Sequence, residues 1–126
     1  MSKILENLLY TESHEWVKLE DGKAKIGITD HAQESLGDIV FLNLPEDGDT
    51  VTAGESFCDV ESVKAVSDIY SPVTGTICAV NDALADSPEL LNEDPYAAWI
   101  CEIEDITDQE SFLSPAEYEA FLQKED

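Results

Sequence analysis

The side chain with the greatest chemical potential in this sequence is the amine of Lys64, in the segment DVESVKAVSDIYSP (residues 59–72). Positive charge is scarce, because 29 acidic residues face only 6 lysines and no arginine. Val63 and Ala65 flank the lysine between two strand-like runs, 55–62 and 66–70, which predicts a tight turn that directs the amine outward. A modifying enzyme could acylate such an amine and ignore the others. The alternative interpretation is an ordinary solvated turn residue.

Other catalytic or metal-binding patterns are weak. His14 and His31 could join a carboxylate around a metal ion, but their spacing is not that of ligands and favours a surface or structural role. No serine elbow, phosphate loop or dinucleotide glycine pattern is present. The cysteines form no C-x-x-C pair and are predicted to be buried, reduced thiols: Cys58, Cys78 and Cys101. We therefore predict that the chain is not an enzyme and holds no metal.

The net charge of −23 bears on the partners and on the compartment. Such a surface repels phosphate backbones and anionic lipid, so no nucleic acid and no membrane partner is expected. It favours partners with basic docking surfaces, although solubility or a salt-rich cytoplasm would explain it equally well. Neither a signal peptide nor an apolar run of about 20 residues is seen. We expect a cytoplasmic bacterial protein, or a mitochondrial matrix protein if this is a processed eukaryotic form.

The elements that must position Lys64 are short strands separated by turn signals. A chain of 126 residues suits one domain (1–126), with a core over about 10–105 and a C-terminal helical extension over about 107–124. Asp21-Gly22 predicts a hairpin turn. Further strands are expected over 38–45, 76–81 and 98–104. This spacing is typical of a small β-sandwich or barrel.

Helix signals are fewer. Asp30 is the expected N-cap of a short helix with Gln33 at the capping-box position, and Gly37 is expected to end it. A second helix is expected after Ser87 as its cap, beginning at Pro88. The tail holds two capping boxes, TDQE (107–110) and SPAE (114–117), and the second opens an amphipathic helix.

Four motifs in order, spanning about Tyr10 to Phe121, resemble one family: YTESHEWV, GITDHAQESLGDIVFLNLP, VESVKAVSDIYSPVTGTI and VNDALADSPELLNEDPY. The chain is similar to the H proteins of the glycine cleavage system, which are lipoyl carriers. The resemblance implies a mainly β, lipoyl-domain-like flattened β-sandwich (a barrel-sandwich hybrid), with a short internal helix and C-terminal helices. It also implies lipoate attached covalently at Lys64, as an N6-lipoyllysine. Biotin carriers place methionines beside their lysine, so Val63 and Ala65 argue against biotin.

The resemblance implies a carrier and not an enzyme. The arm on Lys64 would shuttle the aminomethyl group of glycine between a pyridoxal-phosphate glycine decarboxylase (P protein), a tetrahydrofolate-dependent aminomethyltransferase (T protein) and dihydrolipoyl dehydrogenase (L protein). A lipoate-attaching enzyme is a further implied partner. The alternatives are a lipoate-relay protein that donates lipoyl groups to other carriers, and an acidic interaction domain that has lost carriage.

The resemblance also suggests residues that assist Lys64. Glu15, in the HEW motif, would line a cleft that receives the loaded arm and keeps its amine protonated; a plain exposed strand carboxylate is the alternative. Glu61 and Asp68 flank the lysine and are candidates for recognition by the lipoylating enzyme or the partners. Family members with a histidine at the position of Ser35 place it against the same cleft, so that imidazole is absent here.

Overall fold

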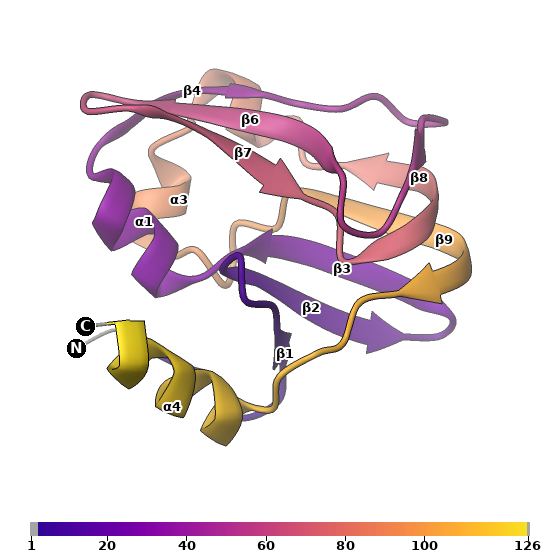
Figure 1. Ribbon diagram of the computed structural model, residues 1–126. Helices are drawn as coiled ribbons and strands as arrows, with labels where there is room; N and C mark the ends of the chain where they lie inside the picture. The colour runs from indigo at the N-terminus through magenta and orange to yellow at the C-terminus, as the bar shows by residue number, and fades with distance from the viewer. Residues whose placement is uncertain (1–2, 126) are drawn as a thin grey trace.

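The computed structural model describes residues 3–125, so positions 1, 2 and 126 of the expected domain lie outside the described residues. Two antiparallel sheets form the body, with β4, β6 and β7 in the upper layer of Figure 1. In spatial order the six-stranded sheet consists of β1 (Leu9–Tyr10), β2 (Glu15–Glu20), β3 (Lys23–Ile28), β9 (Cys101–Gln109), β8 (Val73–Val80) and β5 (Thr50–Val51). The three-stranded sheet consists of β4 (Ile39–Asn43), β6 (Ser56–Ser62) and β7 (Val66–Tyr70). This two-sheet sandwich confirms the predicted fold class, but the helical extension expected over about 107–124 is a single helix among the described residues, Pro115–Glu125, because residues 107–109 belong to β9.

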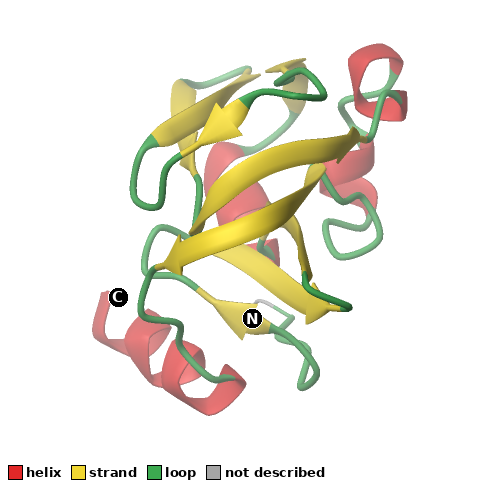
Figure 2. Ribbon diagram, turned by 90° about the vertical axis from the view of Figure 1, so that its right-hand side faces the viewer, coloured by secondary structure: helices red, strands yellow, loops and turns green. Residues whose placement is uncertain are grey.

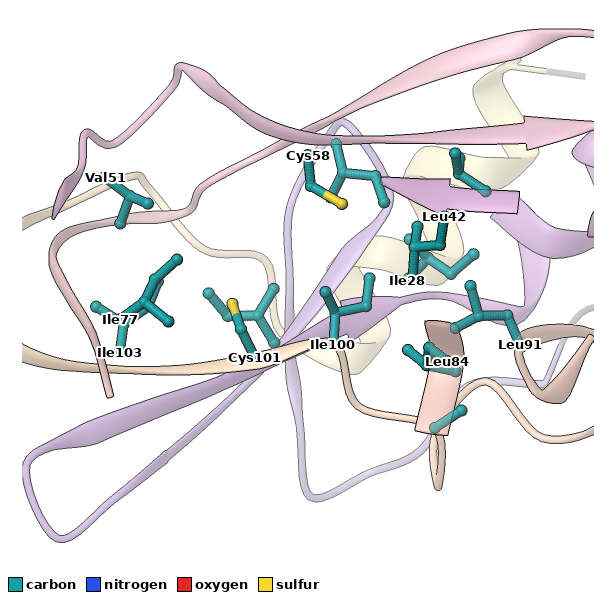
Figure 3. Packing of buried hydrophobic residues seen from close by; sticks show 14 of the residues in the cluster. Ile28, Leu42, Val51, Cys58, Ile77, Leu84, Leu91, Ile100, Cys101 and Ile103 are labelled. Carbon is teal, nitrogen blue, oxygen red and sulfur yellow. The ribbon is translucent and has the colours of Figure 1, made fainter. Parts of the chain in front are cut away.

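Four helices complete the described chain: α1 (Asp30–Leu36), α2 (Ala83–Asp86), α3 (Leu90–Glu93) and α4 (Pro115–Glu125). Figure 2 shows α4 at the lower left, outside the two sheets. The apolar core fills the space between the sheets and the helices α2 and α3, as Figure 3 shows. Leu42 and Cys58 reach it from the small sheet, and Ile77 and Ile103 from the large one. The core therefore holds the small sheet, and with it the β6–β7 hairpin, on a rigid base.

Turn and cap signals of short range are largely confirmed. Asp21 and Gly22 join β2 to β3 with φ of 53° and 76°, the left-handed pair that a two-residue hairpin loop requires. Gly37 ends α1 with φ 77°. The SPAE box opens α4: the backbone N–H of Ser114 donates to the Glu117 carboxylate, and the N–H of Glu117 donates to the Ser114 hydroxyl.

Three expectations about helix ends are wrong. The N-cap of α1 is Thr29, whose hydroxyl accepts from the N–H of Ala32, so Asp30 is already helical. The TDQE residues belong to the long strand β9 and its exit, because β8 pairs with β9 as far as Gln109. Ser87 ends α2 and caps no helix, and α3 begins at Leu90 without a side-chain cap. In the latter two cases, packing of the neighbouring strands and helices overrides a local sequence preference.

The C-terminal helix α4 is joined to the sandwich through Tyr118. Its ring stacks on Tyr10 of β1, with centroids 4.6 Å apart. Its hydroxyl lies 2.9 Å from Nδ1 of His14 and 2.8 Å from Oγ1 of Thr29, the N-cap of α1. One buried hydroxyl therefore connects α4, the start of β2 and the start of α1.

We expect Tyr118→Phe to lower the free energy of unfolding by roughly 1–2 kcal/mol, because the ring stack remains while a buried hydrogen-bonded hydroxyl is lost. Urea unfolding followed by tryptophan fluorescence measures this. Tyr70→Phe is the matched control, since the Tyr70 hydroxyl has no hydrogen-bond partner among residues 3–125. Equal stability of the two variants would contradict the role of the Tyr118 hydroxyl.

Candidate functional site

Lys64 lies at the tip of the β6–β7 hairpin, which extends beyond the body above α1 in Figure 1. The Ser62 hydroxyl shapes the turn, because it accepts from the backbone N–H of Lys64 (3.2 Å) and of Ala65 (3.1 Å). The lysine side chain is exposed, and none of the ion pairs among residues 3–125 involves its amine. The sequence suggested an outward amine, but the part played by Ser62 was not anticipated. A serine two residues before the lysine was the signal for such a turn.

The junction between α1 and β4 supports the hairpin tip from below. The N–H of Val63 donates to the carbonyl of Asp38 at 3.0 Å. The stem of Lys64 runs across Gly37, and a Cβ at that glycine would lie 3.3 Å from the lysine Cε. Gly37 therefore serves both the positive φ that ends the helix and the close passage of the lysine stem.

A cleft of about 460 Å³ lies beside the hairpin, between α1 and β7; we call it the α1–β7 cleft. Its walls combine the start of β2, one face of α1 and two residues of β7. Its polar lining residues are Ser13, His14, Glu15, His31, Ser35, Ser67 and Asp68. These residues are far apart in the sequence and meet only in the folded chain. A second hollow of about 550 Å³ shares Ser13 and Glu15 with the first, and it is also lined by Thr11 and Tyr70.

Glu15 is the unusual group of the cleft, since only 2% of it is exposed. Its carboxylate accepts from the hydroxyls of Thr11 (2.7 Å) and Ser13 (2.6 Å) and, at 3.4 Å, from the N–H of Tyr70. Burial raises the pKa of Glu15 to about 7; the three donors lower it, and the charge of Glu110 adds to the rise. No cation among residues 3–125 is placed against this carboxyl. A basic ligand entering the cleft would meet an acid with no basic partner of its own.

The other sequence-predicted residues lie at two different places. Asp68 lines the α1–β7 cleft together with Glu15. Glu61 lies outside it, on the outer face of the small sheet, where it pairs with Phe41 on one side and Val66 on the other. Ser35 does line the cleft, and His31 lines it from one turn earlier on α1. The cleft therefore contains the imidazoles of His14 and His31, although neither occupies the position of Ser35 that the resemblance indicated.

His14 and His31 come together although their sequence spacing gave no sign of it. Their ring centroids are 4.6 Å apart, and Nδ1 of His14 lies beside the Tyr118 hydroxyl. Within residues 3–125, no group of three or more histidine, cysteine or acidic side chains is arranged to hold a metal ion. The pair forms part of the cleft wall and of its connection to α4.

A flattened two-sheet sandwich that presents one exposed lysine on a protruding hairpin defines the class of lipoyl-domain-like carrier proteins. Comparison with known proteins supplies the family. The sequence profile described as "Glycine cleavage H-protein" matches residues 8–125. The chain is 58% identical to the glycine cleavage system H protein of Lachnoclostridium phytofermentans over 124 residues, 98% of each chain. It is 56% identical over 120 residues to that of Listeria monocytogenes, 93% of this chain and 96% of the relative.

A solved structure agrees with these sequence matches. The crystal structure of a glycine cleavage system H protein from Mycobacterium marinum superposes with a TM-score of 0.91 at 41% identity, covering 95% of this chain and 99% of the other. The chain belongs to the glycine cleavage H-protein family. It is a lipoyl carrier of glycine cleavage and not an enzyme, and the family carries its lipoyl group covalently on a lysine. In the described part of the chain, no helix is both long and apolar enough to cross a membrane.

We expect Glu15→Gln to change how stability depends on pH. The pKa of Glu15 rises from 4.5 to about 7 on folding, so the folded state holds the proton more tightly than the unfolded state. The resulting stabilisation is complete below pH 4.5 and is lost as the pH rises through 7. Relative to the glutamine variant, the wild type should therefore lose about 3 kcal/mol of unfolding free energy between about pH 4 and about pH 8.

Urea titrations at several pH values measure this difference. Glu20→Gln, at the exposed end of the same strand, controls for the loss of one negative charge. A difference between wild type and Glu15→Gln that stays constant with pH would contradict the raised pKa.

Proposed function

We propose that Lys64 is the residue that carries the lipoyl group and that the α1–β7 cleft receives the arm when it is loaded. The observation that carries this proposal is an exposed lysine amine, in no ion pair among residues 3–125, at the tip of a hairpin whose strand β7 forms one wall of a cleft that the buried Glu15 also lines. Amide formation converts the ammonium of Lys64 to a neutral group. The formal net charge then changes from −23 to −24, since one of the 6 positive charges is lost.

The residues present fit the group. Lys64 offers an accessible amine on a turn fixed by Ser62, which orients the arm without enclosing it. When bound, lipoyl supplies a disulfide that opens reductively as one sulfur takes up the aminomethyl group of glycine. The chain's own part is to hold that basic amine. Glu15, with Ser13 and Asp68 nearby, gives an ammonium group a buried anionic partner.

The proton on the amine matters chemically. A carbon that bears both nitrogen and sulfur breaks down when the nitrogen lone pair expels the thiolate. An ion pair with Glu15 keeps the amine protonated, so its lone pair is unavailable. The same ion pair favours the carboxylate form of Glu15, against the burial that raises its pKa. We propose Glu15 as the group that slows this loss, and Glu61 and Asp68 as residues that help the lipoate-attaching enzyme or the partners recognise the hairpin.

The chain is a component of the glycine cleavage system, and we propose three enzymes that meet its arm in turn: the glycine decarboxylase, the aminomethyltransferase and dihydrolipoyl dehydrogenase. A flexible tether raises the local concentration of the carried group at each docked site, typically to about the mM range. We further propose that residues 1–126 form a single lipoyl-carrier domain that works in a bacterial cytoplasm. Its three cysteines are free thiols in the structure, which suits a reducing compartment.

Lipoylation should occur once, at Lys64. We expect incubation with a bacterial lipoate–protein ligase, lipoate and ATP to add the mass of one lipoyl amide to the wild type and nothing to Lys64→Ala. Intact-mass spectrometry with peptide mapping measures both. Lys23→Ala is the matched control, because Lys23 is an exposed lysine beside the two-residue hairpin turn between β2 and β3. Modification that persists in Lys64→Ala would rule out the proposed attachment site.

Loss of the Glu15 carboxylate should shorten the life of the loaded arm. We expect lipoylated Glu15→Gln, loaded by the decarboxylase and then isolated, to release ammonia several-fold faster than loaded wild type. Glu20→Gln should match the wild type. Equal release rates for Glu15→Gln and wild type would show that the cleft carboxyl does not protect the amine.

A further inference from the structure

Apolar side chains gather around the lysine-bearing hairpin instead of scattering over the surface. Of the six large apolar side chains that are exposed in the described part of the chain, four lie here: Val40 (55% exposed), Phe41 (49%), Val63 (66%) and Val66 (63%). We call these four residues, together with Glu61 between them, the hairpin face. Single exposed apolar residues need no explanation, but a group beside a modification site does.

Strand register shows that the group is one surface. Glu61 of β6 is the direct partner of Phe41 in β4 and of Val66 in β7. Direct partners on neighbouring antiparallel strands project from the same side of a sheet, so Phe41 and Val66 flank Glu61 in one row across all three strands. Val63 is exposed in the turn that follows Glu61 and Ser62, one residue before Lys64.

A bulge in β4 adds Val40 to the same exposed region. The register shifts between Ile39 and Phe41, so that Ile39 and Leu42 are both buried while Val40 and Phe41 are both exposed. Strict alternation would have turned Val40 to the opposite side from Phe41. Bulges are a common means of redirecting side chains near functional sites. The chain thus presents two adjacent apolar residues outward where one would be expected.

The surroundings of the hairpin face are acidic. Asp38 is exposed at the foot of the hairpin tip, and Asp59 pairs with Asp68 in the next row of the sheet. The only basic side chain of these strands and their connecting turn is Lys64 itself. A partner that fits this surface therefore needs an apolar contact zone bordered by basic residues.

We propose that the hairpin face is the docking surface for the enzyme that attaches the lipoyl group, a proposal that rests on Lys64 as the attachment site. An enzyme that acylates the lysine Nζ must bring its active site to that atom and so must cover the hairpin tip and its flanks. The enzymes of glycine cleavage act on sulfur at the far end of the arm and can work at a distance from the hairpin. The hairpin face lies where the enzyme that acylates Lys64 must contact the chain.

The test compares lipoylation kinetics of variants that keep the strand. Phe41→Thr and Val66→Thr replace an exposed apolar side chain with a β-branched polar one. We expect each to raise the KM for the protein substrate about fivefold or more, with kcat nearly unchanged, as for interface residues of moderate importance. Leu19→Thr is the matched control, since Leu19 is 45% exposed on β2 of the other sheet, and its KM should equal that of the wild type. Thermal unfolding of all variants confirms equal folding.

A second measurement separates the attaching enzyme from other partners. Phe41→Thr, fully lipoylated by long incubation, should support glycine–CO2 exchange by the glycine decarboxylase at the wild-type KM. Unchanged lipoylation KM in both variants would overturn the docking surface while leaving attachment at Lys64 intact. A raised exchange KM with normal lipoylation would also overturn it, because the face would then belong to the decarboxylase. A wild type that accepts no lipoyl group would overturn the attachment site and the docking surface together.

Discussion

The buried carboxyl of Glu15 is the constraint on which the cleft and much of its surroundings depend. It stands at the start of β2 in the large sheet and accepts a hydrogen bond from the backbone of Tyr70, at the end of β7 in the small one. Burying a carboxyl is costly unless its oxygens find donors, and Thr11 and Ser13 supply two. The fold therefore requires hydroxyl side chains just before β2 and the end of β7 beside Glu15. It also requires an opening to solvent through which a cation can reach the carboxyl.

The β6–β7 hairpin has a different role: it exposes the amine of Lys64 while hydrogen bonds hold its turn in one conformation. Ser62 fixes the turn from within, and the Val63–Asp38 hydrogen bond ties it to the end of α1. The same helix forms a wall of the α1–β7 cleft, and its N-cap Thr29 is bonded to Tyr118 of α4. Attachment point, cleft and C-terminal helix thus share one support, although α4 lies outside the two sheets in Figure 2. A change in α4 would reach the cleft through this connection.

Sequence reasoning succeeded where the cause was local. The turn at Asp21-Gly22, the end of α1 at Gly37 and the SPAE cap all depend on neighbouring residues, and the structure has each of them. The short strands β1 and β5 were not predicted, because two residues carry no period and exist only through pairing with distant partners. The exposure of Lys64 was predicted correctly, because it depends on the local turn between two strands. The meeting of Glu15, Asp68 and His31 depends on how the sheets stack, which no local pattern encodes.

The charge on the arm explains why the cleft would bind the lipoyl arm that carries the aminomethyl group and release the arm without it. Once Lys64 is acylated, the arm is neutral, and the chain's many carboxylates neither attract nor repel it strongly. A basic amine at its end changes this, because the arm then carries the charge that Glu15 lacks. Differential affinity between the two forms is all that is needed to shift the arm between cleft and solvent. On the proposed function, the acidic surface and the buried carboxyl of Glu15 have different roles. The surface contacts the partner proteins, and Glu15 binds the ammonium group at the end of the loaded arm.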